Sequence, residues 1–512
     1  MLWIALHLPL LSLESFAATL PPAPGERPLA LLDAQAILHV NAAARALGVR
    51  PGFKRATALA LAPQLTFGQT DRVRDAQALA AVAHAALAFT PSVSIQPPSA
   101  ATPDDAPHTV LLEVQASLRY FGGLPALRQR LQDALEPLGH RVHTVSARTA
   151  LGAALLARVH THLDCADLGA TRAALERVPV WLLGPGRAHW EALQGMGLRT
   201  VADLRGVPRD GLARRFGEVV LDELDRANGT RPDPREPLAL PPAFDSRLEL
   251  FARADTTEQL MHGAAVLLAR LVAWLSAQHA FVRRFTLLME HEQRSRRDPS
   301  GIAVTSLEVA LAEPSRDPAH LRVLLRERLA QLQLPAPTLE LRLQAADIAR
   351  RAPPNAELFP TPASEHEGLT RLVERLQARL GREQVLRLVP RHDHRPERAT
   401  AWQRVDAAMR PTRVRSAVHG ASASAPHAVR PVWLLQQPEP LHERDSTPLV
   451  EGQALQLLSG PERIESGWWD GELVARDYFI AQLPGGALVW IYRARVPTAA
   501  TAPCWFLQGR FG

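Results

Sequence analysis

The feature that most constrains the fold is the order of helix and strand patterns between residues 243 and 350. Apolar runs typical of strands fall at 247–251, 281–290, 302–310 and 338–344, and helical patterns fall at 257–277 and 318–332. This order, β-α-β-β-α-β, is the split βαβ motif, and its sheet has one open face. We expect Arg283, Arg284 and Arg342 to lie on that open face.

The first 165 residues show a second alternation of strands and helices. Strand patterns fall at 2–8, 37–40, 109–114 and 141–146, and helical patterns fall at 42–47, 54–61, 71–89, 124–135 and 149–159. This alternation predicts one α/β layer domain with a small helical insertion at about 40–70. Asn41 is a good N-cap for the first inserted helix, and Gly48 is a good stop for it.

Residues 166–236 have a small, wholly helical pattern. Two Gly-x-Gly segments with apolar neighbours, Leu183-Gly184-Pro185-Gly186 and, eleven residues on, Gly195-Met196-Gly197-Leu198, resemble a helix-hairpin-helix signature. Glycines there let backbone N–H groups and a helix N-terminus approach a phosphate. We therefore predict contact with a DNA backbone, and ordinary helix-stop glycines are the alternative. The DNA-binding candidates of this region are Gly184, Gly186, Arg187, Gly195, Gly197 and Arg199. Arg283 and Arg284 of the split βαβ unit are DNA-binding candidates as well.

Proline-rich breaks at 232–242 and 353–354 divide the chain further. After the second break, residues 366–429 predict a helix followed by a flexible basic tether, since 391–430 hold eight arginines against three acids. From residue 430 to 512 aromatic residues return between turn signals, which predicts a small all-β module with a hairpin at 474–493. Its aromatic residues fit partner binding, a β core, or both.

Composition narrows the functional classes. All but one of the 58 Lys and Arg residues are arginine, which suits phosphate contacts, although an arginine-biased genome gives the same composition. Cys165 and Cys504 lie far apart, which excludes a disulfide framework or a cysteine-rich zinc site. A signal peptide requires basic residues at its start, but the apolar N-terminus has none before Arg27. No other stretch approaches the length of a membrane span. We expect a cytoplasmic protein without a membrane partner.

Several passages resemble the Y-family of translesion DNA polymerases. Residues 2–14 lie where that family has its first metal-binding strand, 41–65 resembles its nucleotide-contacting segment and fingers helix, and 183–204 resembles its thumb. The resemblance implies a multidomain α+β fold with a palm (1–165, with the fingers insertion), a thumb (166–236), a little finger (243–350), and a C-terminal β module (430–512). Residues 476–493 and 505–512 resemble the tail of a catalytically inactive, polymerase-like subunit of a bacterial mutagenesis complex.

Departures from the family's motifs bear on catalysis. Nucleotidyl transfer needs two divalent ions about 3.5–4 Å apart, held by carboxylates. The positions of those carboxylates hold other residues here: Ala5 and His7 in the first motif, and His108 and Thr109 in the third. The family's triphosphate-contacting Tyr appears as Ala42, while its Arg is retained as Arg45. We therefore predict a protein that is not an enzyme and holds neither a catalytic metal nor a cofactor.

A short peptide follows the little finger, in the segment 351–365, where the family carries a sliding-clamp peptide. Its candidate clamp-binding residues are Asn355, Glu357, Leu358 and Phe359. Adjacent Leu and Phe anchors can fill an apolar pocket, although Asn355 is one methylene shorter than the usual Gln, and a chance apolar pair is the alternative. The resemblance implies four partners: DNA, the sliding clamp, an error-prone C-family DNA polymerase and a RecA-like accessory protein.

Two rival interpretations stay open. The first is an active translesion polymerase with displaced carboxylates at Asp104, Asp105 and Glu113, and the second is a plain DNA-binding protein. Two clusters have metal-ligating residue types, although a solvated turn and a flexible tether explain them better: His160, His162, Asp164 and Cys165, and then His392, Asp393 and His394.

Overall fold

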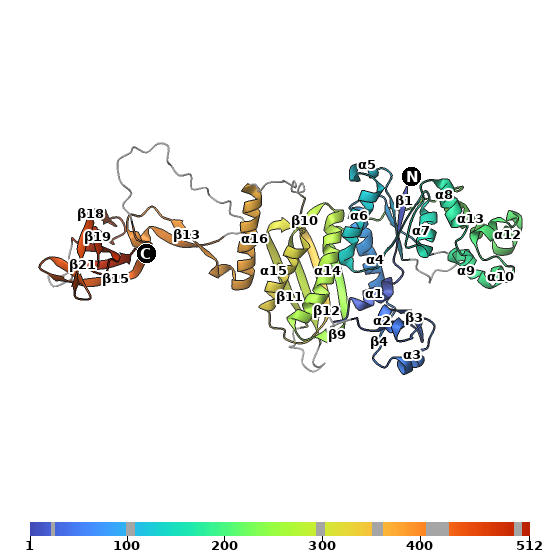
Figure 1. Cartoon of the computed structure of the whole chain (residues 1–512), viewed down its shortest axis with the longest axis horizontal. Helices are drawn as coiled ribbons and strands as arrows, with labels where there is room; N and C mark the ends of the chain where they lie inside the picture. The colour runs from blue at the N-terminus through green and yellow to red at the C-terminus, as the bar shows by residue number, and fades with distance from the viewer. Residues whose placement is uncertain are drawn as a thin grey trace. The chain divides into compact units, whose positions relative to one another are not determined.

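The computed structural model describes residues 1–21, 26–98, 108–292, 303–350, 362–405, 430–495 and 504–511. The chain divides into two compact units, Met1–Arg379 and Leu380–Gly512 (Figure 1). We call them unit 1 and unit 2. Unit 1 holds the palm, fingers, thumb and little finger, and unit 2 holds the C-terminal β module.

The palm is built on a mixed sheet with the strand order β5-β6-β1-β7-β8. These strands are β1 (Trp3–His7), β5 (Val93–Ile95), β6 (Thr109–Glu113), β7 (His143–Ala147) and β8 (His162–Asp164). β1 is central and antiparallel to both β6 and β7. Because its side chains alternate, Ile4 and Leu6 face one core, while Ala5 faces the other.

Helices cover both faces of the palm sheet. The core around Ile4 and Leu6 is closed by α4 (Arg72–Leu87) and α6 (Leu124–Leu135), and the core around Ala5 is closed by α7 (Ala150–Val159). Four short elements complete the palm and were not predicted: β5, β8, α1 (Leu11–Ala17) and α5 (Leu118–Phe121), with the 3-10 turn η1 (Glu136–Leu138) after α6. The alternation predicted for this region is confirmed.

The fingers insertion differs from its prediction. It is a three-stranded sheet with the order β3-β2-β4, covered by two short helices, and not a helical insertion. Its elements are β2 (Leu29–Asp33), β3 (Ala36–Val40), α2 (Ala42–Ala46), α3 (Arg55–Leu61) and β4 (Thr66–Gln69). Short apolar runs carry too little periodicity to separate strand from helix, so β2 and β4 were missed. Asn41 caps α2 as predicted, accepting from the Ala44 N–H at 3.0 Å.

The thumb is helical, as predicted, and shares its core with α7 of the palm. Its elements are α8 (Leu168–Leu175), η2 (Val180–Leu182), α9 (Gly184–Ala188), α10 (Trp190–Gly195), α11 (Val201–Arg205), α12 (Arg209–Phe216) and α13 (Glu218–Asn228). The proline-rich segment 232–242 that follows lies against the palm. The Leu238 N–H donates to the Val93 carbonyl at 2.7 Å, and Asp233 accepts from the Leu151 N–H at 3.1 Å.

The little finger has the predicted β-α-β-β-α-β order, in an antiparallel sheet ordered β11-β10-β12-β9. The elements are β9 (Phe244–Ala254), α14 (Thr257–Ala277), β10 (Ala280–His291), β11 (Val304–Ser315), α15 (Pro318–Ala330) and β12 (Thr338–Arg350). Among the described helices, α14 alone is long and apolar enough to cross a membrane. It is the core helix of this domain, with Trp274 wholly buried. The long helix α16 (Pro362–Leu380) packs beside α15, where Glu374 accepts from His320 at 2.8 Å.

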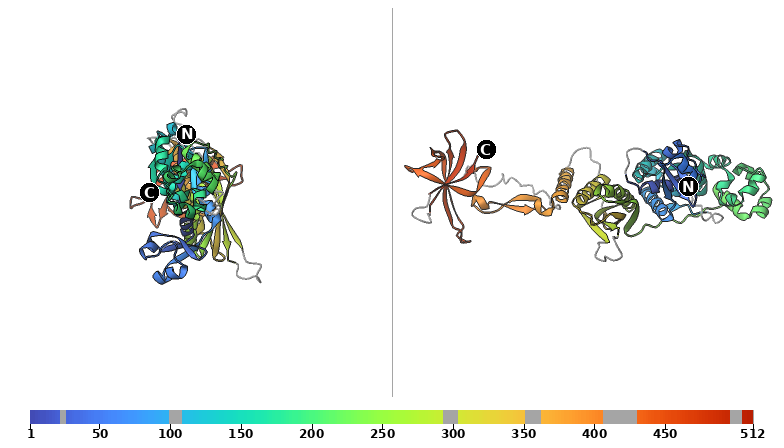
Figure 2. Two further views of the ribbon diagram at one scale, coloured as in Figure 1. Left: turned by 90° about the vertical axis from the view of Figure 1, so that its right-hand side faces the viewer. Right: turned by 90° about the horizontal axis from the view of Figure 1, so that it is seen from below.

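Unit 2 contains a seven-stranded antiparallel sheet, seen with its strongly twisted strands in Figure 2 (right). Its order is β17-β16-β15-β21-β20-β19-β18. The strands are β15 (Trp433–Arg444), β16 (Thr447–Val450), β17 (Gln453–Ala454), β18 (Gln456–Ser466), β19 (Val474–Gln482), β20 (Leu488–Ala494) and β21 (Trp505–Arg510). The predicted hairpin is β19–β20, and Tyr478, Trp490 and Tyr492 form a small core.

The prediction of a flexible tether is wrong for residues 382–405, and residues 406–429 lie outside the described part. The first segment holds η3 (Arg382–Gln384), a hairpin of β13 (Leu386–Pro390) and β14 (Thr400–Arg404), and η4 (Pro396–Arg398) in its connection. The high arginine content does not prevent folding here, because Arg395 and Arg398 in the connection form ion pairs with carboxylates of unit 2.

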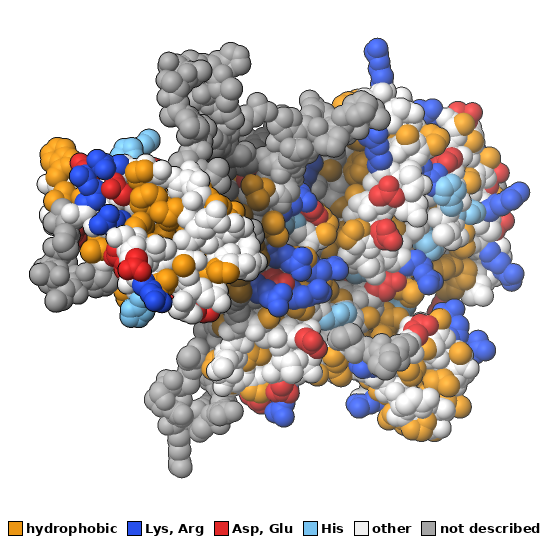
Figure 3. All heavy atoms as spheres, turned by 60° about the vertical axis from the view of Figure 1, so that its left-hand side comes forward, with side chains coloured by type: hydrophobic (Ala, Val, Ile, Leu, Met, Phe, Trp, Pro, Cys, Tyr) orange, Lys and Arg blue, Asp and Glu red, His pale blue; other side chains and the backbone are white. Residues whose placement is uncertain are grey.

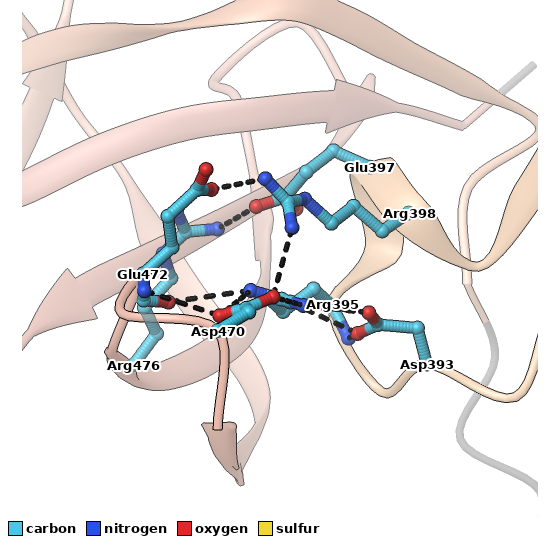
Figure 4. A network of polar contacts seen from close by, with 7 residues as sticks. All are labelled: Asp393, Arg395, Glu397, Arg398, Asp470, Glu472 and Arg476. Carbon is cyan, nitrogen blue, oxygen red and sulfur yellow. Dashed lines mark hydrogen bonds and ion pairs between the residues drawn. The ribbon is translucent and has the colours of Figure 1, made fainter. Parts of the chain in front are cut away.

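Arg395 ties this connection to the loop between β18 and β19 (Figure 4). Its side chain is 2% exposed and donates to Asp393 at 2.8 Å, to Asp470 at 2.6 Å and to the Glu472 carbonyl at 3.3 Å. Arg398 also pairs with Asp470 at 3.0 Å. Hydrogen bonds from Arg395 lower the pKa of Asp393 to about 2, and those to Asp393 and Asp470 raise the pKa of Arg395. Asp393 is therefore an arginine partner and not part of a metal clip.

Candidate nucleic-acid interface

Of the residues that we predicted at the family's carboxylate positions, His7, His108 and Thr109 lie at one end of the palm sheet, and Ala5 lies in the middle of β1. His7 on β1 is in register with Thr109 on β6, and their side chains are 3.0 Å apart. Ala5 is wholly buried in the palm core, and Thr109 is also buried. Leu8 donates its N–H to the His108 carbonyl at 3.0 Å. Among the described residues, no group of three or more His, Cys, Asp or Glu side chains is arranged to hold a metal ion.

Glu113, a member of the displaced-carboxylate alternative, lies at the other end of β6. It is in register with Trp3, four residues from the His7–Thr109 pair, which is about 13 Å along a strand. Its carboxylate accepts from the Leu2 N–H at 3.1 Å and from the Gln115 N–H at 3.2 Å. Glu113 therefore caps backbone groups. Asp104 and Asp105 lie outside the described residues.

The first glycine pair of the thumb has internal roles. The Gly184 N–H donates to the Glu223 carboxylate at 3.1 Å. Gly186 is buried, and a Cβ there would lie 2.0 Å from the Val180 carbonyl oxygen, so close packing requires a glycine. Helix α9, which begins at Gly184, has only five residues. These two glycines are thus explained by packing within the thumb.

The second glycine pair lies in an exposed hairpin between α10 and α11. Gly197 has a φ of +79°, which favours glycine, and Gly195 has open space around it. The N–H groups from Met196 to Thr200 all donate within the chain, the last two to the Asp203 carboxylate at 2.9 and 2.8 Å. These bonds lower the pKa of Asp203. The backbone N–H groups of this hairpin are therefore already occupied, and the side chains of Arg199, beside the hairpin, and Arg187, on α9, are exposed.

The open face of the little-finger sheet carries the predicted arginines, and each of them faces a carboxylate. Arg342 donates to Asp245 at 2.8 Å, Arg284 lies 3.4 Å from Glu308, and Arg283 lies 3.9 Å from Asp347. Basic and acidic side chains are also mixed over the face of the molecule drawn in Figure 3. The sheet therefore presents matched charges and not a basic field.

Three glutamates lie side by side on this open face. Glu340 on β12 is in register with Glu249 on β9 and Glu290 on β10. Burial raises the pKa of Glu340, and the Glu290 carboxylate raises it further. A row of carboxylates repels phosphate, so the middle of the sheet is a poor surface for a nucleic-acid backbone.

Sequence reasoning missed a cleft of about 830 Å³ between the fingers and the little finger. Three phenylalanines from different elements line it, and Phe16 meets Phe251 edge to face at 5.3 Å. Arg74 lies over the Phe16 ring at 5.7 Å, and Arg55 lies over Phe67 at 5.4 Å. Aromatic rings beside arginines are the means by which proteins hold unpaired bases and their phosphates.

The segments that build this cleft lie far apart in the sequence, and no local motif announces them. Gly68 on β4 is the one local clue, because a Cβ there would lie 2.5 Å from the Phe16 ring. The glycine lets the fingers sheet lie directly on α1. The cleft is thus a product of tertiary packing.

Two groups of predicted site residues remain, the possible metal ligands near Cys165 and the clamp-binding peptide. Asp164 lies on the edge strand β8 and not in a turn, and it accepts from Ser146 at 2.6 Å and pairs with Arg128 at 2.6 Å. Cys165 is buried, which raises the pKa of its thiol. The clamp-peptide candidates Asn355, Glu357, Leu358 and Phe359 lie outside the described residues.

Comparison with known proteins completes this description. No model of a known protein family matches the chain. Two curated proteins named Protein ImuB, from Caulobacter vibrioides strains NA1000 / CB15N and ATCC 19089 / CIP 103742 / CB 15, are each 30% identical over 488 residues, covering 91% of this chain and 100% of the relative. A Dbh ternary complex and DinB from Sulfolobus solfataricus each match at 16% identity, with TM-scores of 0.38 and 0.37, over 68% of this chain and 99% of that chain.

The succession of palm, fingers, thumb and little finger in unit 1 is that of a Y-family DNA polymerase-like protein. Similarity to the Caulobacter proteins extends beyond these domains into the tail. Within the Y-family-like class, the chain belongs to the ImuB family.

Proposed function

We propose that this chain is a non-catalytic, polymerase-like scaffold in DNA damage tolerance. The observation that carries the proposal is a polymerase-like fold in which the predicted first-motif positions hold no carboxylate. Ala5 is buried, and His7 contacts Thr109. Such side chains supply no carboxylate oxygen, whereas Mg²⁺ sites in phosphoryl transfer use carboxylates. The palm would then shape a DNA-binding surface, while a separate error-prone C-family DNA polymerase supplies the chemistry.

The DNA contacts of the scaffold are assigned to two places. The thumb offers Arg187 on α9 and Arg199 beside its hairpin to a duplex backbone. The cleft between fingers and little finger offers Arg55 and Arg247 beside phenylalanine rings. Glu249 and Glu340 also line this cleft, so we assign its phosphate contacts to the arginines on the walls away from these two carboxylates. Arginine forks suit phosphate oxygens, and rings suit unpaired bases. A primer-template has both a duplex and a single-stranded part, which matches the two places.

Recruitment is assigned to the tail. The peptide around Leu358 and Phe359 would bind the sliding clamp, and unit 2 would bind the C-family polymerase and a RecA-like accessory protein. Unit 2 exposes Trp433 and Trp468 at 71% and 78%, and exposed tryptophans are frequent interface anchors.

Primer extension on a primer-template tests the catalytic part of the proposal. We expect the purified chain to bind the DNA and to add no nucleotide with Mg²⁺ or Mn²⁺. An active polymerase from the same cell is the positive control. Metal-dependent extension that is abolished in an Asp104→Ala/Asp105→Ala variant would establish the displaced-carboxylate enzyme instead.

Surface plasmon resonance against the sliding clamp tests recruitment. We expect a Leu358→Ala/Phe359→Ala variant to bind the clamp roughly 100-fold more weakly, because two apolar anchors are lost. Ala356→Ser in the same peptide is the matched control. Binding that ignores the double substitution would remove this peptide from the mechanism.

A further inference from the structure

A cavity of about 590 Å³ lies at the seam between the palm and the little finger. Its walls come from α1 and η1 on the palm side, and from α14 and α15 on the little-finger side. We call it the seam cavity. Its charged and titratable side chains are Glu14, His140, His262, Arg270, Arg322 and Arg326. Three arginines thus surround a cavity with one carboxylate, and the proposed function uses none of them.

Arg270 on α14 is the most unusual of these side chains. It is 5% exposed, and no carboxylate of the described residues lies within ion-pair distance of its guanidinium. Its Nη1 donates to the Ser246 hydroxyl at 3.1 Å and to the Gln77 amide oxygen at 3.3 Å. Buried charges in proteins are ordinarily paired with an opposite charge. Burial lowers the pKa of Arg270 to about 10, so the side chain still carries its charge at neutral pH.

Arg322 and Arg326 form the second wall. They are four residues apart on α15, so they lie on one face of the helix, and both are exposed. Within the described part of the chain, neither side chain has a hydrogen bond or an ion pair. Like charges at this spacing destabilise a helix by a few tenths of a kcal/mol, and an anion between them removes that repulsion.

The palm side of the cavity does not neutralise these arginines. Glu14 is engaged there: its Oε2 accepts from the Arg141 N–H at 3.0 Å and lies 3.5 Å from His140 Nδ1. The His140 side chain is 7% exposed, and its Nδ1 has no hydrogen-bond partner. This nitrogen is enclosed beside Glu14, so the His140 ring forms part of the palm wall of the cavity.

We propose that the seam cavity binds a phosphate group, carried either by a free nucleotide or by a nucleic-acid backbone. Guanidinium forks from Arg322 and Arg326 would bind the phosphate oxygens, and the positive charge of Arg270, which also lines the cavity, would add to the attraction. The cavity volume lies within the range of small-molecule sites, about 300–1,000 Å³.

Occupation of the cavity has a structural consequence. The little-finger helix α14 already contributes Ala273 to the palm core, next to α4. A phosphate held by α15 in the seam cavity would also lie against the palm residues of the cavity wall, and so would contact both domains. The ligand would therefore stabilise this arrangement of palm and little finger relative to arrangements in which the seam opens.

The test compares two variants of the full chain that lose the same charge. Arg322→Ala/Arg326→Ala empties the seam cavity of its exposed arginines, and Arg283→Ala/Arg284→Ala removes two arginines of the open sheet face that have carboxylate partners. The probes are ATP without divalent metal, by isothermal titration calorimetry, and a fluorescent 12-nucleotide oligothymidylate, by anisotropy. Melting curves establish that both variants fold.

We expect the seam variant to bind at least one probe roughly 10-fold or more weakly, while the sheet variant binds like the wild type. Loss confined to ATP identifies a nucleotide ligand, and loss confined to the oligonucleotide identifies a backbone phosphate. An equal loss of probe affinity in both variants would show that only the net charge of the protein matters, and it would overturn the proposal. No measurable binding of either probe by the wild type would overturn it as well.

Discussion

Two buried arginines, one in each unit, occupy opposite electrostatic settings. Arg395 in unit 2 is 2% exposed and contacts the carboxylates of Asp393 and Asp470. Arg270 in unit 1 is 5% exposed and contacts only neutral oxygens among the described residues. The shifts in pKa follow these partners: that of Arg395 is raised by its carboxylates, and that of Arg270 is lowered by burial to about 10.

The difference separates a structural arginine from a candidate binding arginine. A buried cation that is surrounded by carboxylates is neutralised within the fold, so it fastens two segments and has little capacity left for a ligand. A buried cation beside a cavity, with no opposite charge, leaves a site where an anion is favoured. Arg283, Arg284 and Arg342 on the open sheet face resemble Arg395 in this respect, although they are exposed.

Arg395→Met removes the centre of the unit 2 network and leaves Asp393 and Asp470 without their main partner. We expect the melting temperature of unit 2 to fall by roughly 5 °C or more, because unpaired carboxylates remain at a packed contact. Tryptophan fluorescence reports the transition, since Arg395 lies over the Trp469 ring at 5.7 Å. Arg444→Met, at an exposed position of the same unit, should leave the transition unchanged. An unaltered melting curve for Arg395→Met would mean that the network does not stabilise unit 2.

Arg270→Met should cost less stability than Arg395→Met. The substitution leaves the acceptors Gln77 and Ser246 without their donor, which costs about 1–3 kcal/mol, but it also removes a buried charge that has no counter-ion. Denaturant unfolding of unit 1 measures the change. If Arg270→Met lost more stability than Arg395→Met, Arg270 would be a structural arginine like Arg395 and not a candidate binding residue.

Protonation of Asp393 at low pH should weaken the Arg395 network and lower the stability of unit 2. The pKa of Asp393 falls from its ordinary value of 3.8 to about 2 in the folded chain. Between these values the unfolded chain binds more protons than the folded one, so the stability supplied by Asp393 is complete above about pH 4 and is lost as the pH falls towards 2. Fluorescence-monitored unfolding at each pH measures this slope. Asp393→Asn should flatten it, and an equal slope in that variant would exclude Asp393 as its source.

The smallest effect is expected at the open sheet face. Arg342→Ala removes an arginine that is matched by Asp245 at 2.8 Å, so its charge is already balanced. We expect the Kd for a primer-template to change less than about twofold, since an exposed matched pair contributes little. Arg55→Ala/Arg247→Ala in the cleft is the comparison and should weaken binding more. The reverse order would return the sheet face to the DNA interface.

Much of the fold followed from local patterns. The β-α-β-β-α-β order of the little finger was predicted because its helices are long. Asn41 marked the start of α2. The assignment of Ala5 and His7 to the family's metal positions also comes from residue identity alone, and it stays a prediction that primer extension tests. These signals act over a few neighbouring residues, so no knowledge of the fold is needed.

Tertiary structure alone decided which arginines are matched. Arg342 and its partner Asp245 are 97 residues apart, and Arg395 and Asp470 are 75 residues apart. Nothing local distinguishes these arginines from Arg322 or Arg326. The fingers sheet, the cleft around Phe16 and the seam cavity likewise join distant segments. Coulomb energy depends on distance in space and on burial, and both are set only when the chain has folded.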